Sequence, residues 1–233
     1  LCILALSPQG HAHSWVERAY VLSGDTIVGE PGFPRGNVLR TSPSFTDETM
    51  TYLLPPNNRN PSEILPSDPI CKETQRTNNQ TAGSPMLLAR ASDKVLLMYQ
   101  ENGHVTKLTD GQNSGFISVY GTSTPSPTDT LQDIHGVWSF EQWRESGGKN
   151  GMIYLGGFDN GHCYQDNGSP EASKRKTLNQ RQHLDVEGND LWCGRRLFLP
   201  KGLTPGSIYT LYWVWPFVGA VGKKEIYTTC LDI

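Results

Sequence analysis

His13 is the residue with the clearest chemical potential, because the stretch before it has the features of a secretory leader. Residues 1–6 are apolar, and Gly10-His11-Ala12 places small residues at the first and third positions before His13. Leader peptidases cut after this pattern. Cleavage after Ala12 would leave His13 with a free α-amine beside its imidazole, two neutral nitrogen donors that suit copper. The alternative is a leader that ends near a histidine by chance.

Two further stretches carry residues that would complete such a metal site. His104 follows the turn signal Glu101-Asn102-Gly103, which comes after the apolar residues 94–100. Glu225 and Tyr227 lie two apart near the end of the chain, and residues two apart in a strand share a face. The alternatives stay open: a turn or surface histidine, a surface carboxylate and a core tyrosine.

The composition favours a scaffold of strands for these residues. The 233 residues include 24 Gly and 16 Pro, and the apolar segments between these breakers are short. No apolar run approaches the ~20 residues of a membrane-spanning helix. The sequence therefore predicts an all-β fold, an immunoglobulin- or fibronectin-like β-sandwich with long loops.

Apolar and alternating segments locate the strands. The predicted strands are residues 13–22, 87–90, 94–100, 116–121, 134–143, 191–200, 209–215 and 225–231. Loops are predicted for residues 29–36, 42–70 (with 50–54 as an apolar segment) and 165–190. The last of these loops contains the basic run Lys174-Arg175-Lys176, which we interpret as solvated, with contact to a polyanion as the alternative.

We expect residues 1–12 to be a signal peptide remnant and residues 13–233 to form one domain, long enough for a full core. A net charge of −3 without a basic patch argues against nucleic-acid binding. Sequons at Asn79 and Asn167 predict glycosylation. The mature protein is expected to be a secreted monomer, in the medium or at the cell wall. A missing C-terminal tail or anchor stays open.

Outside the leader the chain has four cysteines, Cys71, Cys163, Cys193 and Cys230. An even number in a secreted chain predicts two disulfides, with three possible pairings. We favour Cys163–Cys193, which closes the shorter loop, and Cys71–Cys230, which ties the last strand to the first half. A zinc site is the weaker alternative, because no pair has Cys-x-x-Cys spacing.

Three blocks, taken together, resemble the secreted fungal lytic polysaccharide monooxygenases. The blocks are His13-Ser14-Trp15-Val16-Glu17, residues 101–106, and the aromatic strand 209–215 followed by residues 224–230. The last block is similar to the ending of the chitin-active fungal branch. More closely, the chain looks like a group of fungal proteins similar to these enzymes that begin His-Ser-Trp-Val-Glu.

This resemblance implies a copper site formed by the amine and imidazole of His13 and the imidazole of His104. Tyr227 would stand near the axial position, and Glu225 would orient a bound oxygen species. The implied activity is oxidative cleavage of glycosidic bonds in chitin, cellulose or another wall glycan, with an external electron donor. Three neutral nitrogens with open positions suit both oxidation states of copper.

The sequence also offers candidate residues for polysaccharide binding and several rival functions. Flat polysaccharides usually need exposed aromatic side chains near the metal, and Trp15, Tyr20 and Phe33 are the candidates, with burial as the alternative for Trp15. His135 is a further candidate for a residue that supports a metal ligand without contacting the metal. The rival functions are a copper carrier or cell-wall protein without oxidase chemistry, and a β-sandwich module without metal. A hydrolase is the least favoured, because no Gly-x-Ser-x-Gly and no supported pair of carboxylates occurs.

Overall fold

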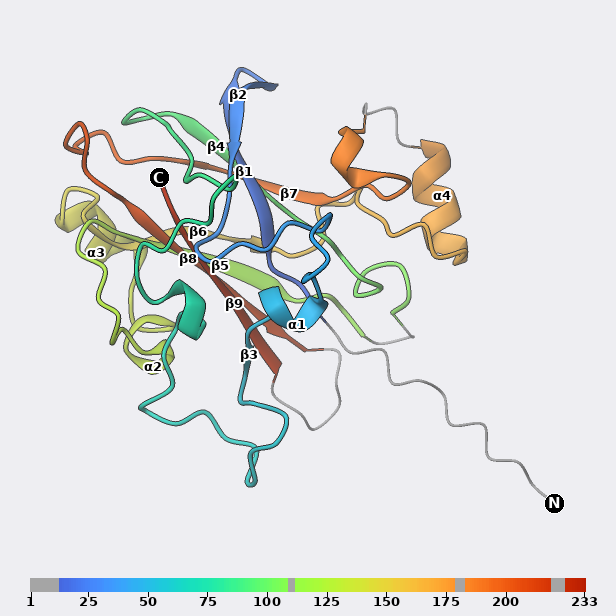
Figure 1. Cartoon of the computed structure of the whole chain (residues 1–233), viewed down its shortest axis with the longest axis horizontal. Helices are drawn as coiled ribbons and strands as arrows, with labels where there is room; N and C mark the ends of the chain where they lie inside the picture. Colours follow the sequence, from blue (N-terminus) through green and yellow to red (C-terminus); the bar gives the residue numbers. More distant parts are fainter. Residues whose placement is uncertain (1–12, 109–111, 179–182, 219–224) are drawn as a thin grey trace.

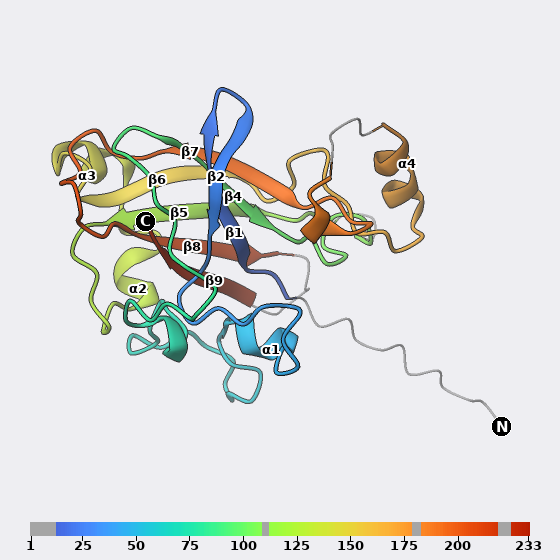
Figure 2. The same ribbon diagram turned by 45° about the horizontal axis from the view of Figure 1, so that its top comes forward.

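The computed structural model describes residues 13–108, 112–178, 183–218 and 225–233. In this part, two antiparallel sheets face each other, with strand orders β2-β1-β4-β7 and β3-β9-β8-β5-β6 (Figures 1 and 2). The strands are β1 Val16–Ser23, β2 Thr26–Gly32, β3 Leu53–Leu54, β4 Lys94–Tyr99, β5 Phe116–Thr122, β6 Asn150–Gly157, β7 Cys193–Phe198, β8 Thr210–Phe217 and β9 Glu225–Asp232. The predicted all-β sandwich is confirmed.

The main core lies between the sheets, where alternate residues of the central strands point inward. Val95, Leu97 and Tyr99 from β4 meet Ile117 and Val119 from β5 in one buried cluster. Strand β8 is buried on both faces. Its outer face packs in a second cluster against residues of α2 and against the segment that precedes α2 in the sequence. The strongly apolar, aromatic composition of β8 follows from this double burial.

Two predicted strands are absent, and short helices replace one of them. Residues 134–143 were expected to be extended, but α2 (Leu131–Ile134) and α3 (Phe140–Glu145) lie there. Each helix begins at a hydroxyl cap: Thr130 Oγ1 accepts from Asp133 N at 3.3 Å, and Ser139 Oγ accepts from Gln142 N at 3.1 Å. Such caps satisfy free amides of the first turn, which outweighs the strand-like apolar pattern.

Residues 87–90 also form no strand. Leu87 is buried, whereas Leu88 is among the most exposed apolar side chains, so the segment packs on the core without joining a ladder. Strand β2 extends into residues 29–32, which were expected to be loop, and β6 was not predicted.

The remaining helices lie in segments expected to be loops. They are α1 (Asp47–Met50) and α4 (Pro170–Leu178), with short 3-10 turns at Glu73–Gln75 and Asp185–Glu187. In α4 the basic run is neutralised: Lys174 pairs with Glu171, Arg175 with Asp159, and Lys176 with Asp166. This pairing argues against a polyanion site there.

Both favoured disulfides are present. Cys71 bonds to Cys230 and Cys163 bonds to Cys193. The cysteines therefore hold no zinc. Cys230 lies on β9 three residues after Tyr227, and Cys193 pairs with Tyr99 at the end of β4, so each bond braces a strand that leads to the predicted metal site.

Candidate metal centre

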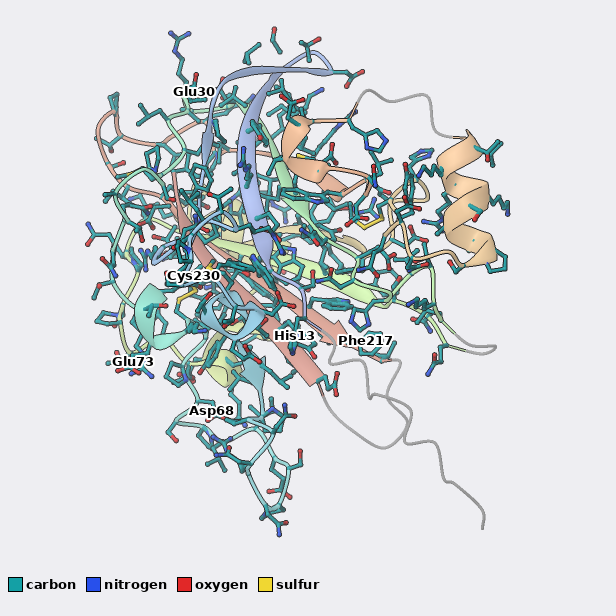
Figure 3. The ribbon with its side chains drawn as sticks, turned by 45° about the vertical axis from the view of Figure 1, so that its right-hand side comes forward. His13, Glu30, Asp68, Glu73, Phe217 and Cys230 are labelled. Carbon is teal, nitrogen blue, oxygen red and sulfur yellow. A yellow bond between two sulfur atoms is a disulfide. The ribbon has the colours of Figure 1, made fainter. Side chains whose placement is uncertain are left out.

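The start of β1 is fixed at one end of the sandwich by bonds to both sheets. Ser14 Oγ donates to Gln100 O at 2.8 Å, just beyond β4. Val16 N donates to Thr229 Oγ1 on β9 at 3.2 Å. Figure 3 shows His13, directly before this anchored segment, at the same end of the sandwich as Phe217 of β8.

The residues after His13 pack around one arginine. The Arg40 guanidinium lies 4.9 Å from the ring centre of Trp15 and 4.8 Å from that of Phe45. Its Nε donates to the buried Glu17 carboxylate at 3.1 Å. Burial raises the pKa of Glu17, and the charge of Arg40 offsets this only in part. The His-Ser-Trp-Val-Glu block is thus a structural anchor for His13.

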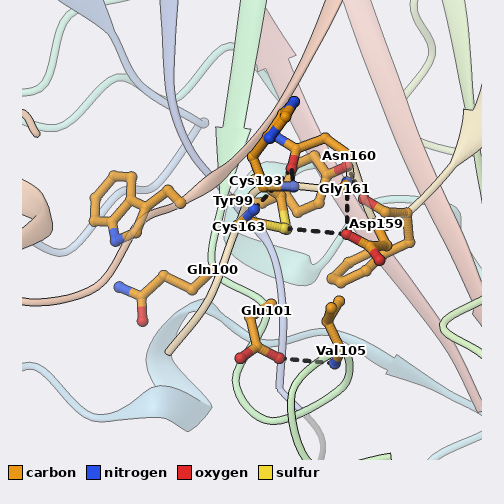
Figure 4. The surroundings of a disulfide bond; sticks show 12 residues. Tyr99, Gln100, Glu101, Val105, Asp159, Asn160, Gly161, Cys163 and Cys193 are labelled. Atoms are coloured by element: carbon orange, nitrogen blue, oxygen red, sulfur yellow. Dashed lines mark hydrogen bonds between the residues drawn. A yellow bond between two sulfur atoms is a disulfide. The ribbon is translucent and has the colours of Figure 1, made fainter. Parts of the chain in front are cut away.

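The loop that carries His104 is organised by a buried carboxylate, Glu101. It accepts hydrogen bonds from Val105 N at 2.7 Å (Figure 4), from Thr106 N at 3.3 Å and from Gln165 N at 2.7 Å. Gln165 lies two residues after Cys163, so the loop is tied to the segment that the disulfide holds. Several amides converging on one carboxylate make a strong, rigid turn.

Asn102 and Gly103 turn the chain so that His104 faces inward. Both have left-handed backbones, with φ of 45° and 82°, a conformation that Gly and Asn adopt at the lowest cost. The side-chain amide of Asn102 donates to the carbonyl of His13. This turn therefore orients His104 and also holds His13 in place.

The His104 side chain is buried against aromatic rings. Its ring contacts Phe217 at 4.5 Å and Trp215 at 5.1 Å between centroids, both edge-on. Burial, together with the nearby charge of His13, lowers its pKa to about 4. Its Nε2 is buried and has no hydrogen-bond partner, an arrangement that costs stability and calls for an explanation.

Tyr227 and Glu225 come to the same end of the sandwich through β9. Tyr227 pairs with Trp215 and Glu225 with Phe217 across β8 and β9, and the Tyr227 and Trp215 rings are 5.3 Å apart. Tyr227 Oη donates to Glu225 Oε2 at 3.1 Å. Burial raises the pKa of Tyr227, and the Glu225 carboxylate adds to the effect. His13, His104, Tyr227 and Glu225 are thus brought together around Trp215 and Phe217.

The three aromatic side chains expected to bind polysaccharide are buried, so that expectation is wrong. Trp15 packs under Arg40, and Phe33 lies under the Arg18 guanidinium at 5.2 Å. Tyr20 packs in a small core cluster with Trp192. They stabilise the sheet that carries His13.

The other candidates lie away from the four residues. His135 Nδ1 bonds to the hydroxyl of Tyr120 at 2.9 Å, beside α2, so it does not support the predicted metal ligands. Of the sequons, Asn79 is exposed, whereas Asn167 Nδ2 donates to Thr106 Oγ1 at 2.8 Å. Asn79 is the sequon better placed to accept a glycan.

Asp47 is a neighbour of His13 that the sequence analysis missed. Its Oδ2 lies 3.5 Å from His13 Nδ1. Lys72, next to Cys71, holds the end of α1 by donating to the carbonyls of Thr49 at 2.9 Å and Thr51 at 3.0 Å. Glu101 and Asn102 were missed as well, although the Asn-Gly pair itself signals a left-handed turn.

The predicted copper site differs from a metal site that is built from side chains alone. Among the described residues, no three His, Cys, Asp or Glu side chains form a group that could hold an ion. The predicted site would use only two side chains of these types, His13 and His104, with a backbone amine as a further nitrogen donor and Tyr227 near the axial position. The same residues contain no helix with the length and apolar character needed to cross a membrane.

Comparison with known proteins assigns a family without a function. No curated protein and no solved structure matches the chain. A family match covers residues 10–233, which include all of the elements and the four residues described above. The chain belongs to the family described as Domain of unknown function (DUF7492).

Proposed function

We propose that the mature chain, cut after Ala12, is a secreted protein that binds copper through His13 and His104. We propose further that it is a monooxygenase that oxidatively cleaves glycosidic bonds of a polysaccharide. The observation that carries the proposal is the Nε2 atom of His104, which is buried and unpartnered in a side chain only 8% exposed. An unmet buried polar group costs about 1–3 kcal/mol, and a metal ion would remove that cost.

The residues present fit copper by their chemistry. After cleavage, the amine and Nδ1 of His13 would chelate the ion, and His104 would supply Nε2. All three are neutral nitrogens, the donors that suit copper in both oxidation states. Because the pKa of His104 is lowered to about 4, its lone pair stays available in mildly acidic media.

The surrounding residues would set the conditions at the site. Phe217 and Trp215 keep water from His104, and Glu101 and Asn102 hold the two histidines in register. The Tyr227 hydroxyl donates a hydrogen bond to the Glu225 carboxylate. Glu225 would hold or deliver a proton at the site. Bound copper would supply one-electron chemistry toward O2 or peroxide, with electrons from an external donor.

A specific observation favours a second candidate, a copper-binding or cell-wall protein without catalysis. Trp15, Tyr20 and Phe33 are buried, and the exposed large apolar side chains of the described residues include no Trp or Tyr. A flat, crystalline polysaccharide would find few aromatic platforms. Soluble chains or copper transfer are the uses that this surface fits.

Copper binding is the first experiment. Calorimetry and Cu(II) spin resonance would compare the chain beginning at His13 with a version carrying Ala12 in front of it. We expect the first to bind with a three-nitrogen signature and the second to lose affinity, because its His13 nitrogen is an amide. Equal binding by both versions, or none, would remove the proposal.

Substitutions separate the ligands from ordinary histidines. His104→Ala should lower copper affinity by more than about 100-fold, beyond the loss caused by removing an outer-shell group. The matched control is His162→Ala, at an exposed turn, which should bind as the wild type does. Mass spectrometry of oxidised oligosaccharides, with a reductant and chitin or cellulose, then distinguishes the enzyme from the non-catalytic copper protein.

A further inference from the structure

A pocket of about 510 Å³ lies between α3 and the segment that follows β7. It is distant from the candidate metal centre. Strand β7 begins with Cys193, opposite Tyr99 near the His104 loop, and ends with Phe198, opposite Lys94. The pocket adjoins Phe198 and so lies at the other end of the sandwich, where Figures 1 and 2 place α3 apart from α1.

The walls of this pocket are rigid. Gly148 N donates to Trp143 O at 2.8 Å and closes the turn after α3, and Tyr209 Oη donates to Gly148 O at 2.9 Å from the core. On the opposite wall, Leu199 N donates to Asp93 O at 3.0 Å. The volume lies within the range of about 300–1,000 Å³ that small-molecule sites occupy, and the site needs no rearrangement to form.

The lining combines an apolar body with positive charge. Trp143 and Phe198 offer aromatic surface, and Phe198, the last residue of β7, is 63% exposed. Arg144 and Lys201 supply two cations, and no carboxylate side chain is among the lining residues. Arg144 pairs with Glu141 at 3.8 Å, but both are largely exposed, and such pairs are weak.

These features select the class of ligand. An aromatic ring can stack on Trp143 or Phe198, and a carboxylate would bind the cations by charged hydrogen bonds. A sugar would instead bring hydroxyl groups into a lining whose one hydroxyl side chain is Ser92. We propose that this pocket is a binding site for a small aromatic carboxylate, independent of the candidate metal centre.

Calorimetry on the full mature chain tests the proposal, with 2-naphthoate as the probe and with 2-naphthamide and glucuronate as comparison ligands. We expect saturable binding of 2-naphthoate, and at least about tenfold weaker binding of the neutral amide and of glucuronate. Equal binding of the amide or of glucuronate, or no saturable heat from 2-naphthoate, would overturn the proposal.

Surface variants locate the binding. Lys201→Glu and Phe198→Ala should each weaken 2-naphthoate binding by about tenfold, and the matched control Lys174→Glu, on α4, should not. Thermal unfolding checks that each variant is folded, which is expected because both side chains are exposed. Equal affinity in Lys201→Glu and the wild type would place the ligand elsewhere and overturn the assignment.

Discussion

Strand β9 carries a buried polar cluster at each of its ends, and the two clusters are built differently. At the C-terminal end, Arg35 is 2% and Asp232 0% exposed. Two hydrogen bonds of 2.9 and 2.7 Å join them, and Arg35 also donates to Gln75 O and Thr210 Oγ1. At the N-terminal end, His104 is 8% exposed and packs, like Tyr227, against Trp215, and its Nε2 has no partner.

This difference separates a structural cluster from a candidate site. A buried group that has all its partners is explained by folding alone. A buried imidazole that lacks one, in a loop whose Glu101 and Asn102 side chains both have partners, is not. We therefore expect substitutions at the two ends of β9 to change stability in opposite directions.

The largest effect is expected at the satisfied end. Arg35→Leu leaves Asp232 buried without its counter-charge, a situation that costs about 3–5 kcal/mol. Chemical denaturation should show this loss in the free energy of unfolding. The exposed Arg196→Leu serves as control and should change it by less than about 0.5 kcal/mol. A small loss in Arg35→Leu would mean that the cluster is not what stabilises this end.

Glu101 should behave like Asp232, although it lies beside the candidate site. Glu101→Gln removes one acceptor oxygen from a group that takes several amide bonds, and hydrogen bonds to charged groups contribute about 1.5–3 kcal/mol each. We expect a loss of about 2–3 kcal/mol in unfolding free energy together with weaker copper binding. Glu141→Gln, on the surface of α3, should change neither. Full stability in Glu101→Gln would exclude the proposed role of this carboxylate.

At the N-terminal end of β9, where a nitrogen of His104 lacks a partner, substitution should raise the stability instead of lowering it. His104→Leu replaces the imidazole with an apolar side chain among Trp215 and Phe217, and it removes the unmet polar atom. The metal-free protein should gain about 1 kcal/mol of stability while copper binding is lost. His162→Leu should leave both quantities unchanged. A destabilised His104→Leu would indicate that the imidazole has a structural partner and would remove the contrast between the two ends.

Much of the scaffold follows from local patterns in the sequence. The alternation in β5, the alternating aromatic run of β8 and the apolar run of β4 predict strands, because such short segments between turn signals are typical of strands in a packed sheet. The disulfide pairing was predicted as well. Residues 134–143 were misassigned because their apolar pattern fits a strand, while the deciding features are the single hydroxyls of Thr130 and Ser139.

The candidate site was only partly predictable. His13, His104, Glu225 and Tyr227 could be named from residue types and block order. The roles of Glu101 and Asn102 could not, since they depend on bonds to Gln165, 64 residues away, and to His13, 89 residues away. Local sequence patterns carry no information about such partners, which exist only after the sheets have packed.

The smallest expected effect concerns a third polar pair, Arg59 and Asp68, which lies away from both ends of β9. The Arg59 guanidinium bonds to Asp68 and holds the pKa of that carboxyl below its usual value, although burial opposes the shift. The folded chain therefore binds this proton less readily than the unfolded chain, so the pair stabilises the fold above about pH 4. Its contribution should fade as the pH falls through the lowered pKa. Thermal unfolding of the wild type and of Asp68→Asn should differ at neutral pH and converge in acid. A difference that stayed constant with pH would show that Asp68 acts through neutral hydrogen bonds, as with Leu65 N at 2.8 Å, and not through its charge.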